Sequence, residues 1–173
     1  MLRELASDLW IADQPLRFFG IELGARMTIV RLPSSQLLLH SPIACSRELI
    51  ERLAVLGSPR FLIAPNRFHH IYIQDWQSAF PDCRVYVAPG LEQKRPDLAV
   101  AGVLDDQPLS DWSAVVDQAV VKGFPLSNEV VFFHKSSRTL IASDLAFNVG
   151  STSPLVTRLA FRIAGAYGCL STT

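Results

Sequence analysis

The sequence predicts a single α/β domain in which two β-sheets face each other and helices cover their outer faces. Of the 173 residues, 49% are apolar and 18% are charged, the lean charge of an α/β protein with buried strands. The predicted elements follow the order β-hairpin block, αβαβ, β-hairpin block, α, and two facing sheets with helices outside satisfy that order. Because no linker or low-complexity segment divides the chain, residues 1–173 are expected to form one domain.

The first part of the chain is predicted to contain several strands followed by a helix. Short apolar runs alternate with turn residues, and a tight turn at 33–36 joins two strands into a hairpin. The expected strands cover residues 9–12, 16–19, 27–31 and 37–41. Ser46 is a suitable N-cap for a helix that runs to about Leu56, and Gly57 follows as a stop.

Residues 60–90 are the stretch around which the rest of the chain is organised. Phe61–Ala64 is predicted to be a strand buried on both faces, and Arg84–Ala88 is the next strand. Between them, a helix is expected from His69 to Phe80. The loop before this helix follows the carboxyl end of a strand, which is where open α/β sheets bind ligands. The sequence therefore predicts a functional site at this loop.

The remaining elements are predicted from apolar runs separated by polar turns. A short helix is expected from Leu91 to about Arg95, and Ser153-Pro154 opens a last helix, with Ser as its cap and Pro at its first position. Strands are expected at residues 99–104, 114–121, 129–134 and 139–143. This completes the second β-hairpin block and the closing helix.

Composition excludes several classes of partner and location. The formal net charge is zero, so no basic excess indicates nucleic acid binding. The three cysteines are widely spaced and form no C-x-x-C pair, which favours reduced thiols in a cytoplasmic protein over a disulfide framework or zinc knuckle. The N-terminal residues mix acids with apolar side chains, unlike a signal peptide, and no apolar run is long enough to cross a membrane. We therefore expect no nucleic acid and no membrane as partners.

Four polar residues are the main candidates for the predicted site. His69 and His70 can each be a metal ligand or a general base, and they can equally cap backbone groups and pack with neighbouring aromatic rings. Adjacent helical residues point about 100° apart, which argues against both binding one ion. Asp144 follows an apolar strand, where a carboxylate can bind a metal or bond backbone N–H groups. Asn66 is a candidate for a further polar group in the same pocket.

The sequence offers three further titratable residues, for which a structural role is the simpler interpretation: Glu129, His134 and His40. Glu129 could add a polar group to the same pocket. His134 precedes a hairpin turn and is expected at the surface, and His40 ends a strand and is expected to be partly buried and hydrogen-bonded. The sequence contains no G-x-S-x-G elbow, no G-x-G-x-x-G and no P-loop, so it indicates neither an α/β-hydrolase nucleophile nor a phosphate loop.

Three segments resemble the metallo-β-lactamase fold, an αββα four-layer sandwich. Residues 27–41 resemble its opening hairpin, residues 61–86 its strand, metal loop, helix and strand, and residues 129–147 its later hairpin. More closely, Ala64-Pro-Asn followed by His69-His70, Val-Phe-Phe-His and Ser-Asp-Leu-Ala-Phe-Asn resembles a bacterial and plant branch known only as a domain of unknown function. The resemblance implies this four-layer fold for residues 1–173.

The resemblance also implies which residues occupy the family's metal positions. Active members carry H-x-H-x-D-H after the strand, and Asp144 matches a bridging aspartate. An ungapped alignment places the four motif positions on Ala64, Asn66, Phe68 and His69, and a shift of one residue places them on Pro65, Arg67, His69 and His70. Phe124 follows Gly123 where the family has a further histidine, and no histidine follows His134. The chain is therefore expected to be a form shortened at its C-terminus with an incomplete metal motif.

Two functions are expected from this incomplete motif. The first is a metallo-β-lactamase-like protein without two-metal hydrolysis, acting as a binding or scaffold protein or lacking catalysis. The second is a single-metal hydrolase of an ester, thioester or phosphoester, with one divalent metal, zinc foremost, near His69, His70 and Asp144. The apolar residues 155–167 of the last helix could drive homodimerisation if nothing else covers them, and the small-molecule substrate is not identified.

Overall fold

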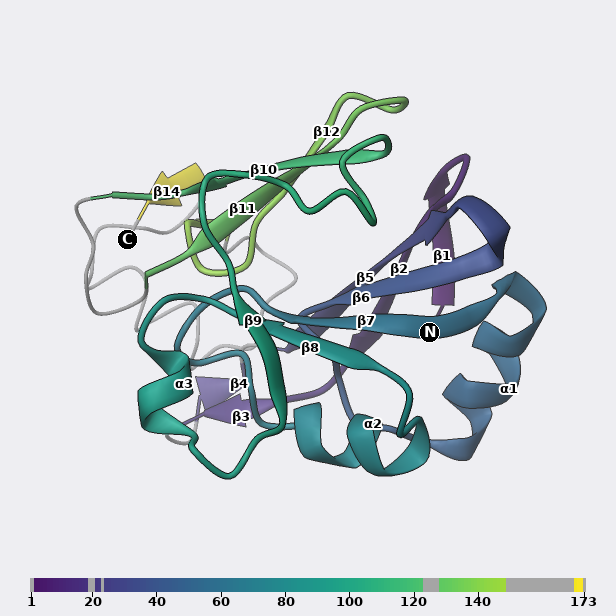
Figure 1. The fold of residues 1–173 in the computed structure, drawn as a ribbon, viewed down its shortest axis with the longest axis horizontal. Helices are drawn as coiled ribbons and strands as arrows, with labels where there is room; N and C mark the ends of the chain where they lie inside the picture. Colours follow the sequence, from purple (N-terminus) through teal and green to yellow (C-terminus); the bar gives the residue numbers. More distant parts are fainter. Residues whose placement is uncertain (1, 19–20, 23, 123–127, 149–169, 173) are drawn as a thin grey trace.

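The computed structural model describes residues 2–18, 21–22, 24–122, 128–148 and 170–172, and its centre is a seven-stranded sheet (Figure 1). The strand order in this sheet is β1-β2-β5-β6-β7-β8-β9. The strands are β1 (Leu2–Ala6), β2 (Leu9–Gln14), β5 (Ala25–Leu32), β6 (Gln36–His40), β7 (Ser58–Ala64), β8 (Arg84–Val87) and β9 (Val100–Val103). The first four strands pair antiparallel, and β6 to β9 pair parallel. Between β2 and β5 the chain forms the small hairpin β3 (Arg17–Phe18) and β4 (Ile21–Glu22).

The hairpin β5–β6 and the helix α1 (Arg47–Leu56) confirm the sequence prediction. The Oγ of Ser46 accepts a hydrogen bond from Leu49 N, so Ser46 caps the helix as expected. Gly57 ends it, with its N–H donated to the carbonyl of Leu53. Leu49 and Leu53 are the buried residues of α1, and they pack on the sheet. These two residues are four apart in the sequence, so they lie on one face of the helix.

The helix after the histidine loop is shorter than its apolar spacing predicts. Helix α2 spans Ile73–Ala79, whereas the sequence predicts its start at His69. The side chain of Asn66 accepts the backbone N–H groups of Phe68 and His69, which holds these residues in turns before the helix can begin. Because these two bonds stabilise turns, residues 69–72 do not become helical, although the apolar spacing of the segment predicts a helix from His69.

The large sheet carries a separate apolar core on each face, because its strands alternate their side chains. Helices α1, α2 and α3 (Leu91–Lys94) lie below the sheet in Figure 1, and a second sheet lies above it. The core on the helix side includes Leu39, Leu62, Val85 and the ring of Trp76. The core between the sheets is built from the opposite faces of the same strands, including Leu38, Phe61, Ile63, Tyr86 and Trp112. The architecture is that of the predicted layered sandwich.

The second sheet consists of three antiparallel strands in the order β10-β11-β12. These strands are β10 (Val116–Val120), β11 (Val130–His134) and β12 (Thr139–Ile141). A further two-stranded sheet pairs β13 (Ala146–Asn148) with β14 (Leu170–Thr172). The last helix expected from Ser153-Pro154, and the apolar segment 155–167 proposed to dimerise, lie outside the described residues.

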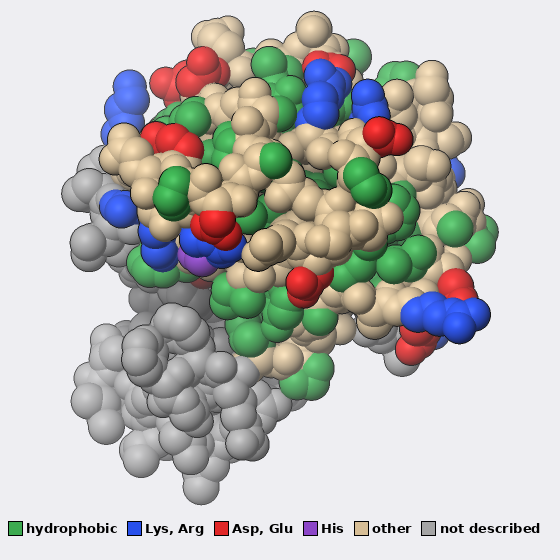
Figure 2. All heavy atoms as spheres, turned by 60° about the horizontal axis from the view of Figure 1, so that its bottom comes forward, with side chains coloured by type: hydrophobic (Ala, Val, Ile, Leu, Met, Phe, Trp, Pro, Cys, Tyr) green, Lys and Arg blue, Asp and Glu red, His purple; other side chains and the backbone are tan. Residues whose placement is uncertain are grey.

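The charged side chains of the helix-covered face are mixed in sign. Figure 2 shows Lys and Arg interspersed with Asp and Glu on this face, with no broad area of a single sign among the described residues. None of the described helices has the length and apolar character needed to cross a membrane.

Candidate functional site

The candidate site lies where three strands of the two sheets end. Ser41 follows β6 and Pro65-Asn66 follows β7, two parallel neighbours that end at the same edge of the large sheet. Ser143 and Asp144 follow β12 of the second sheet. The N–H of Val130 donates to the carbonyl oxygen of Pro65 at 2.8 Å, which joins the two sheets at this edge. Residues from four separate segments of the sequence therefore meet at one place.

A chain of hydrogen bonds joins a serine, a histidine and a carboxylate at this edge. The Oγ of Ser41 lies 2.5 Å from Nδ1 of His69, and Nε2 of His69 lies 3.1 Å from Oδ1 of Asp144. The side chains of His69 and Asp144 are 27% and 25% exposed, so solvent reaches both, whereas Ser41 is 5% exposed. A nucleophile, a base and an orienting acid within hydrogen-bond reach are the arrangement used for nucleophilic catalysis.

The fully buried side chain of Asn66 fixes the positions of both members of the His69–Asp144 pair. Its Oδ1 accepts the backbone N–H of His69 at 2.9 Å, and its Nδ2 donates to Oδ2 of Asp144 at 2.8 Å. Nδ2 also lies 3.4 Å from the hydroxyl of Ser143. One amide therefore orients the histidine loop and the carboxylate at the same time.

Glu129 holds the opposite side of the site by bonding the backbone. This residue is 3% exposed, and its carboxylate accepts the N–H groups of Ser143 at 2.6 Å and Asp144 at 2.8 Å. Charge-assisted bonds of this kind are stronger than those between neutral groups. Asn66 and Glu129, which the sequence suggested as further polar groups of the pocket, thus both lie in the site and support Asp144.

The donor and acceptor pattern around His69 has a consistent proton assignment. With the Ser41 hydroxyl donating to Nδ1, the ring carries its proton on Nε2 and donates it to Asp144. Burial raises the pKa of Asp144, but the bonds from His69 and Asn66 outweigh burial and lower that pKa below its ordinary value. Asp144 therefore stays ionised and orients the imidazole as an acceptor for the serine proton.

His40 is almost completely buried near His69, which corrects the expectation of a partly buried residue, whereas the expected hydrogen bonding is met in part by a bond to the backbone. It is 2% exposed, and its Nε2 has no hydrogen-bond partner among the described residues. Its ring packs edge-on against Phe132. Burial, followed by the nearby His69, lowers the pKa of His40 to about 3. The ring therefore stays neutral, and its adjacency to His69 disfavours a second positive charge at this edge.

The structure holds His70 away from the Ser41–His69–Asp144 chain. Its Nδ1 lies 2.8 Å from Nη1 of Arg95, and Arg95 in turn pairs with Asp97. Burial and the cations Lys94 and Arg95 lower the pKa of His70. Of the three predicted metal residues, the structure thus brings His69 and Asp144 together and directs His70 toward the α3 segment.

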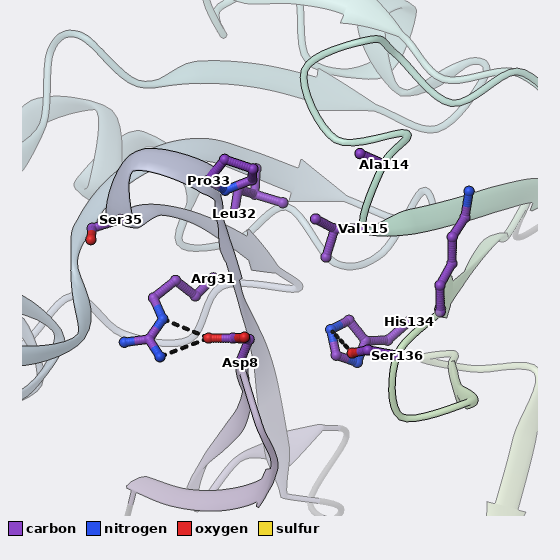
Figure 3. Close-up of a pocket in the computed structure, with 10 residues that line it drawn as sticks. Asp8, Arg31, Leu32, Pro33, Ser35, Ala114, Val115, His134 and Ser136 are labelled. Atoms are coloured by element: carbon purple, nitrogen blue, oxygen red, sulfur yellow. Dashed lines mark hydrogen bonds and ion pairs between the residues drawn. The ribbon is translucent and has the colours of Figure 1, made fainter.

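His134 was expected at the surface, and the structure corrects this, because its side chain is fully buried beside a cavity away from the candidate site. Nδ1 of His134 lies 2.7 Å from the hydroxyl of Ser137. The cavity, of about 630 Å³, lies at the end of the sandwich where β5 turns into β6, opposite the edge where β6 ends at the candidate site. Figure 3 shows that Asp8 and Arg31, which line it, are bonded to each other.

The described thiols are unsuited to act as nucleophiles. Burial raises the pKa of Cys83 to about 11, and it also raises the pKa of the half-buried Cys45. A thiol reacts through its thiolate, so raised pKa values make both side chains less reactive. The remaining cysteine, Cys169, lies outside the described residues.

The described residues do not fit a metal centre of the kind that the resemblance implies. Ala64, Asn66 and Phe68 carry no metal-binding group of the histidine or carboxylate type. His69 and Asp144 offer two such groups, and within the described part of the chain no group of three His, Cys, Asp or Glu side chains is placed to hold an ion. Structural and catalytic zinc sites use three or four protein ligands.

Ser41 is the site residue that sequence reasoning missed. It is 28 residues from His69 in the sequence, and no local motif links the two. Its position just after a buried strand was visible, but any strand end offers the same signal. Only the parallel pairing of β6 with β7 brings Ser41 beside the histidine loop.

The fold is similar to that of several solved metallo-β-lactamase-fold structures, at low sequence identity. "Metallo-beta-lactamase from Pontibacter korlensis" has a TM-score of 0.68 and 10% identity over 98% of this chain and 90% of that chain. The structure of TMB-1 has a TM-score of 0.71 and 10% identity over 88% of this chain and 73% of that chain. The Flv1 flavodiiron core from Synechocystis sp. PCC6803 has a TM-score of 0.64 and 14% identity, covering 94% of this chain and 47% of that one.

Sequence comparison identifies the family. No curated protein matches the chain. A family model described as a domain of unknown function, DUF4336, matches residues 6–163, which is most of the 173 residues. The chain therefore has the metallo-β-lactamase fold and belongs to the DUF4336 family.

Proposed function

We propose that this protein hydrolyses a carboxylic ester or thioester by proton transfer at His69, without the two-metal centre of metallo-β-lactamase-fold hydrolases. The observation that carries the proposal is the 3.1 Å contact between His69 Nε2 and Asp144 Oδ1 at a solvent-reachable strand edge. An oriented, partly exposed imidazole with an ionised carboxylate behind it is a general base. The fold similarity supports a hydrolytic reaction only by analogy.

His69 has the environment that base catalysis requires. The side chain of Asn66 holds the backbone of His69, and Asp144 accepts the proton of His69 Nε2. The other ring nitrogen, Nδ1, faces the hydroxyl group of Ser41 and not a second acid. In this arrangement Nδ1 takes a proton from the attacking hydroxyl and returns it to the leaving oxygen or sulfur. Asp144 stabilises the imidazolium formed between these two transfers.

A single divalent cation at this edge is the second candidate, with zinc the first metal to test. It is favoured by the same 3.1 Å separation, because His69 Nε2 and Asp144 Oδ1 are near enough to face one ion. Ser41 is bonded to His69 and Asn66 is bonded to Asp144, and such bonds orient metal ligands. A bound cation would supply a water of lowered pKa. In this candidate His70 is the predicted third ligand, so it must leave Arg95.

The test combines metal analysis with hydrolysis. Protein purified without added metal is examined by elemental mass spectrometry and assayed on p-nitrophenyl butyrate and an acyl thioester, with and without a chelator. We expect less than a stoichiometric amount of metal and hydrolysis that survives chelation. His69→Ala should lower kcat by about 100-fold or more, because general-base catalysis contributes about that much. Asp144→Asn should also lower kcat, since it replaces the carboxylate that stabilises the imidazolium with a neutral amide.

His70→Ala is the matched comparison, since it removes the neighbouring histidine. It should leave hydrolysis unchanged under the metal-free proposal. About one equivalent of metal, with activity lost on chelation and in His70→Ala, would instead establish the single-metal candidate. A folded protein that hydrolyses none of these substrates would reject both.

A further inference from the structure

We infer that Ser41 is the nucleophile of this site and forms a covalent acyl-serine intermediate. The inference rests on the proposed function, because it uses the same His69–Asp144 pair as its base. It adds Ser41 as the nucleophile and an acyl-serine intermediate. Neither is part of a mechanism in which a metal or His69 activates water for direct attack.

The first observation is the hydrogen bond from Ser41 to the base. Ser41 Oγ lies within 2.5 Å of His69 Nδ1, which in turn is linked through Nε2 to Asp144. Serine hydroxyls are weak nucleophiles until a base within bonding reach accepts their proton. Among the described residues, Ser137 and Ser136 also contact a histidine, His134, at 2.7 and 3.5 Å, and that histidine is fully buried. Of these three serines, Ser41 is the one whose histidine is reached by solvent, and Ser41 itself is 5% exposed.

The second observation is the backbone conformation of Ser41. Its φ is 55°, in the left-handed region that residues other than glycine seldom adopt. Its N–H donates to the carbonyl of Ile63 in the neighbouring strand, so the sheet itself holds this conformation. A serine in a sharp turn directly after a buried strand is how α/β-hydrolases present their nucleophile. Here the turn presents the hydroxyl to the histidine loop.

The third observation concerns the surroundings of His69, which favour an apolar acyl group. Phe68 and Ile71, in the same turn as His69, are 45% and 52% exposed. The ammonium group of Lys94 lies 5.3 Å from the centroid of the Phe68 ring. The apolar side chains of this turn make esters and thioesters of apolar carboxylic acids the first substrates to test.

The reaction has two balanced halves. Oγ of Ser41 attacks the acyl carbon while its proton moves to Nδ1 of His69, and the bond from that carbon to the leaving oxygen or sulfur breaks. The leaving alcohol or thiol takes the proton from Nδ1. Water then attacks the acyl-serine, His69 takes its proton and returns it to Oγ, and the carboxylic acid is released. The sum is one ester or thioester and one water giving an acid and an alcohol or thiol.

Pro42, the residue after Ser41, lacks a backbone N–H, and this lowers the kcat that we expect. In α/β-hydrolases the residue after the nucleophile donates its N–H to the oxyanion, and proline has no N–H to donate. Loss of one such donor lowers kcat by about 10²–10³-fold. We therefore expect slow turnover.

The test is covalent labelling of the full chain. A fluorophosphonate probe should add to wild-type protein once, and peptide mapping should place the adduct on Ser41. Ser41→Ala and His69→Ala should each abolish the adduct, and Ser137→Ala should retain it as the matched control. Ser41→Cys keeps a nucleophile in place, and it should take up an acyl group from the thioester, which guards against a folding defect in Ser41→Ala.

The outcomes separate this inference from the proposed function. Hydrolysis that persists in folded Ser41→Ala, with no adduct in the wild type, would overturn the serine nucleophile and leave base catalysis on water in place. An adduct on Ser41 without turnover of any ester would support the nucleophile and contradict hydrolysis. Neither adduct nor hydrolysis in folded wild-type protein would reject both.

Discussion

At the scale of single residues, the site shows how a few buried polar groups determine the state of the exposed ones. Asn66 and Glu129 are almost completely buried. Asn66 bonds the backbone of the histidine loop and the side chain of Asp144, and Glu129 bonds the backbone N–H groups of Ser143 and Asp144. His40 differs, because its Nε2 is buried without a partner among the described residues. A buried, unprotonated imidazole links the stability of the protein to pH.

We predict that His40 makes the protein less stable in mild acid. Its pKa is about 3 in the folded protein and about 6.5 in an unfolded chain, so the unfolded state binds one more proton between these values. Stability should therefore fall as pH falls below about 6.5, at about 1.4 kcal/mol per pH unit from this residue. Urea unfolding over this range measures the slope.

His40→Phe should reduce the acid slope, because phenylalanine cannot take up the proton. His70 and His134 also have lowered pKa values and contribute slopes of the same sign, so the slope should decrease without disappearing. An unchanged slope in this variant would show that His40 does not remain neutral in the folded protein.

At the scale of secondary-structure elements, one close approach fixes the entry of the chain into β7. Gly57 lies between α1 and β7, and a Cβ at this position would lie 2.1 Å from the carbonyl oxygen of Ser35. The turn before β6 and the end of α1 are therefore in contact through backbone atoms. Since β6 and β7 pair in parallel, this contact sets the register that later brings Ser41 beside the histidine loop.

Gly57→Ala should accordingly destabilise the protein. The added methyl group must displace backbone rather than a flexible side chain, so we expect a loss of about 1–3 kcal/mol in the free energy of unfolding. Urea unfolding followed by circular dichroism measures this loss. Val55→Ala, at an 84% exposed position of the same helix, is the control and should change stability by less than about 0.5 kcal/mol. Equal stability of the two variants would contradict the close approach.

At the scale of the whole molecule, the large sheet couples two cores that do not touch each other. Strands β6, β7 and β8 give alternate side chains to the helix-side core and to the core between the sheets. Trp76 lies in the first core, and Trp112 lies in the second, where it contacts the rings of Phe61 and Tyr86. Neither core can open without exposing apolar faces of these shared strands.

We therefore predict that both cores unfold in one cooperative transition. The chain has three tryptophans, so two variants with single tryptophans, one retaining Trp76 and one retaining Trp112, report on each core separately. In each variant the fluorescence midpoint in urea should equal the midpoint from circular dichroism of the same variant. A fluorescence transition that precedes the loss of secondary structure in only one variant would show that the cores unfold independently.

The sequence by itself determined the hairpin β5–β6, the capped helix α1 and the buried strands, because these depend on local apolar spacing and on residues such as Ser46 and Gly57. It also indicated the strand end at which the site lies, and it named His69, Asp144, Asn66 and Glu129. It did not predict β1, β4, β13 or β14. The start of α2 could not be predicted, because a side-chain bond from Asn66 outweighs the helical spacing there.

Only the tertiary structure decided how the candidate residues combine. It brought His69 to Asp144, directed His70 to Arg95, and added Ser41. It also buried His134 at the far end of the sandwich. The physical reason is that parallel pairing of β6 with β7, and the contact of the second sheet at Pro65, bring together distant segments, with a direct bond between Asn66 and Asp144, 78 residues apart. Such contacts leave no periodic pattern in the sequence from which they could be predicted.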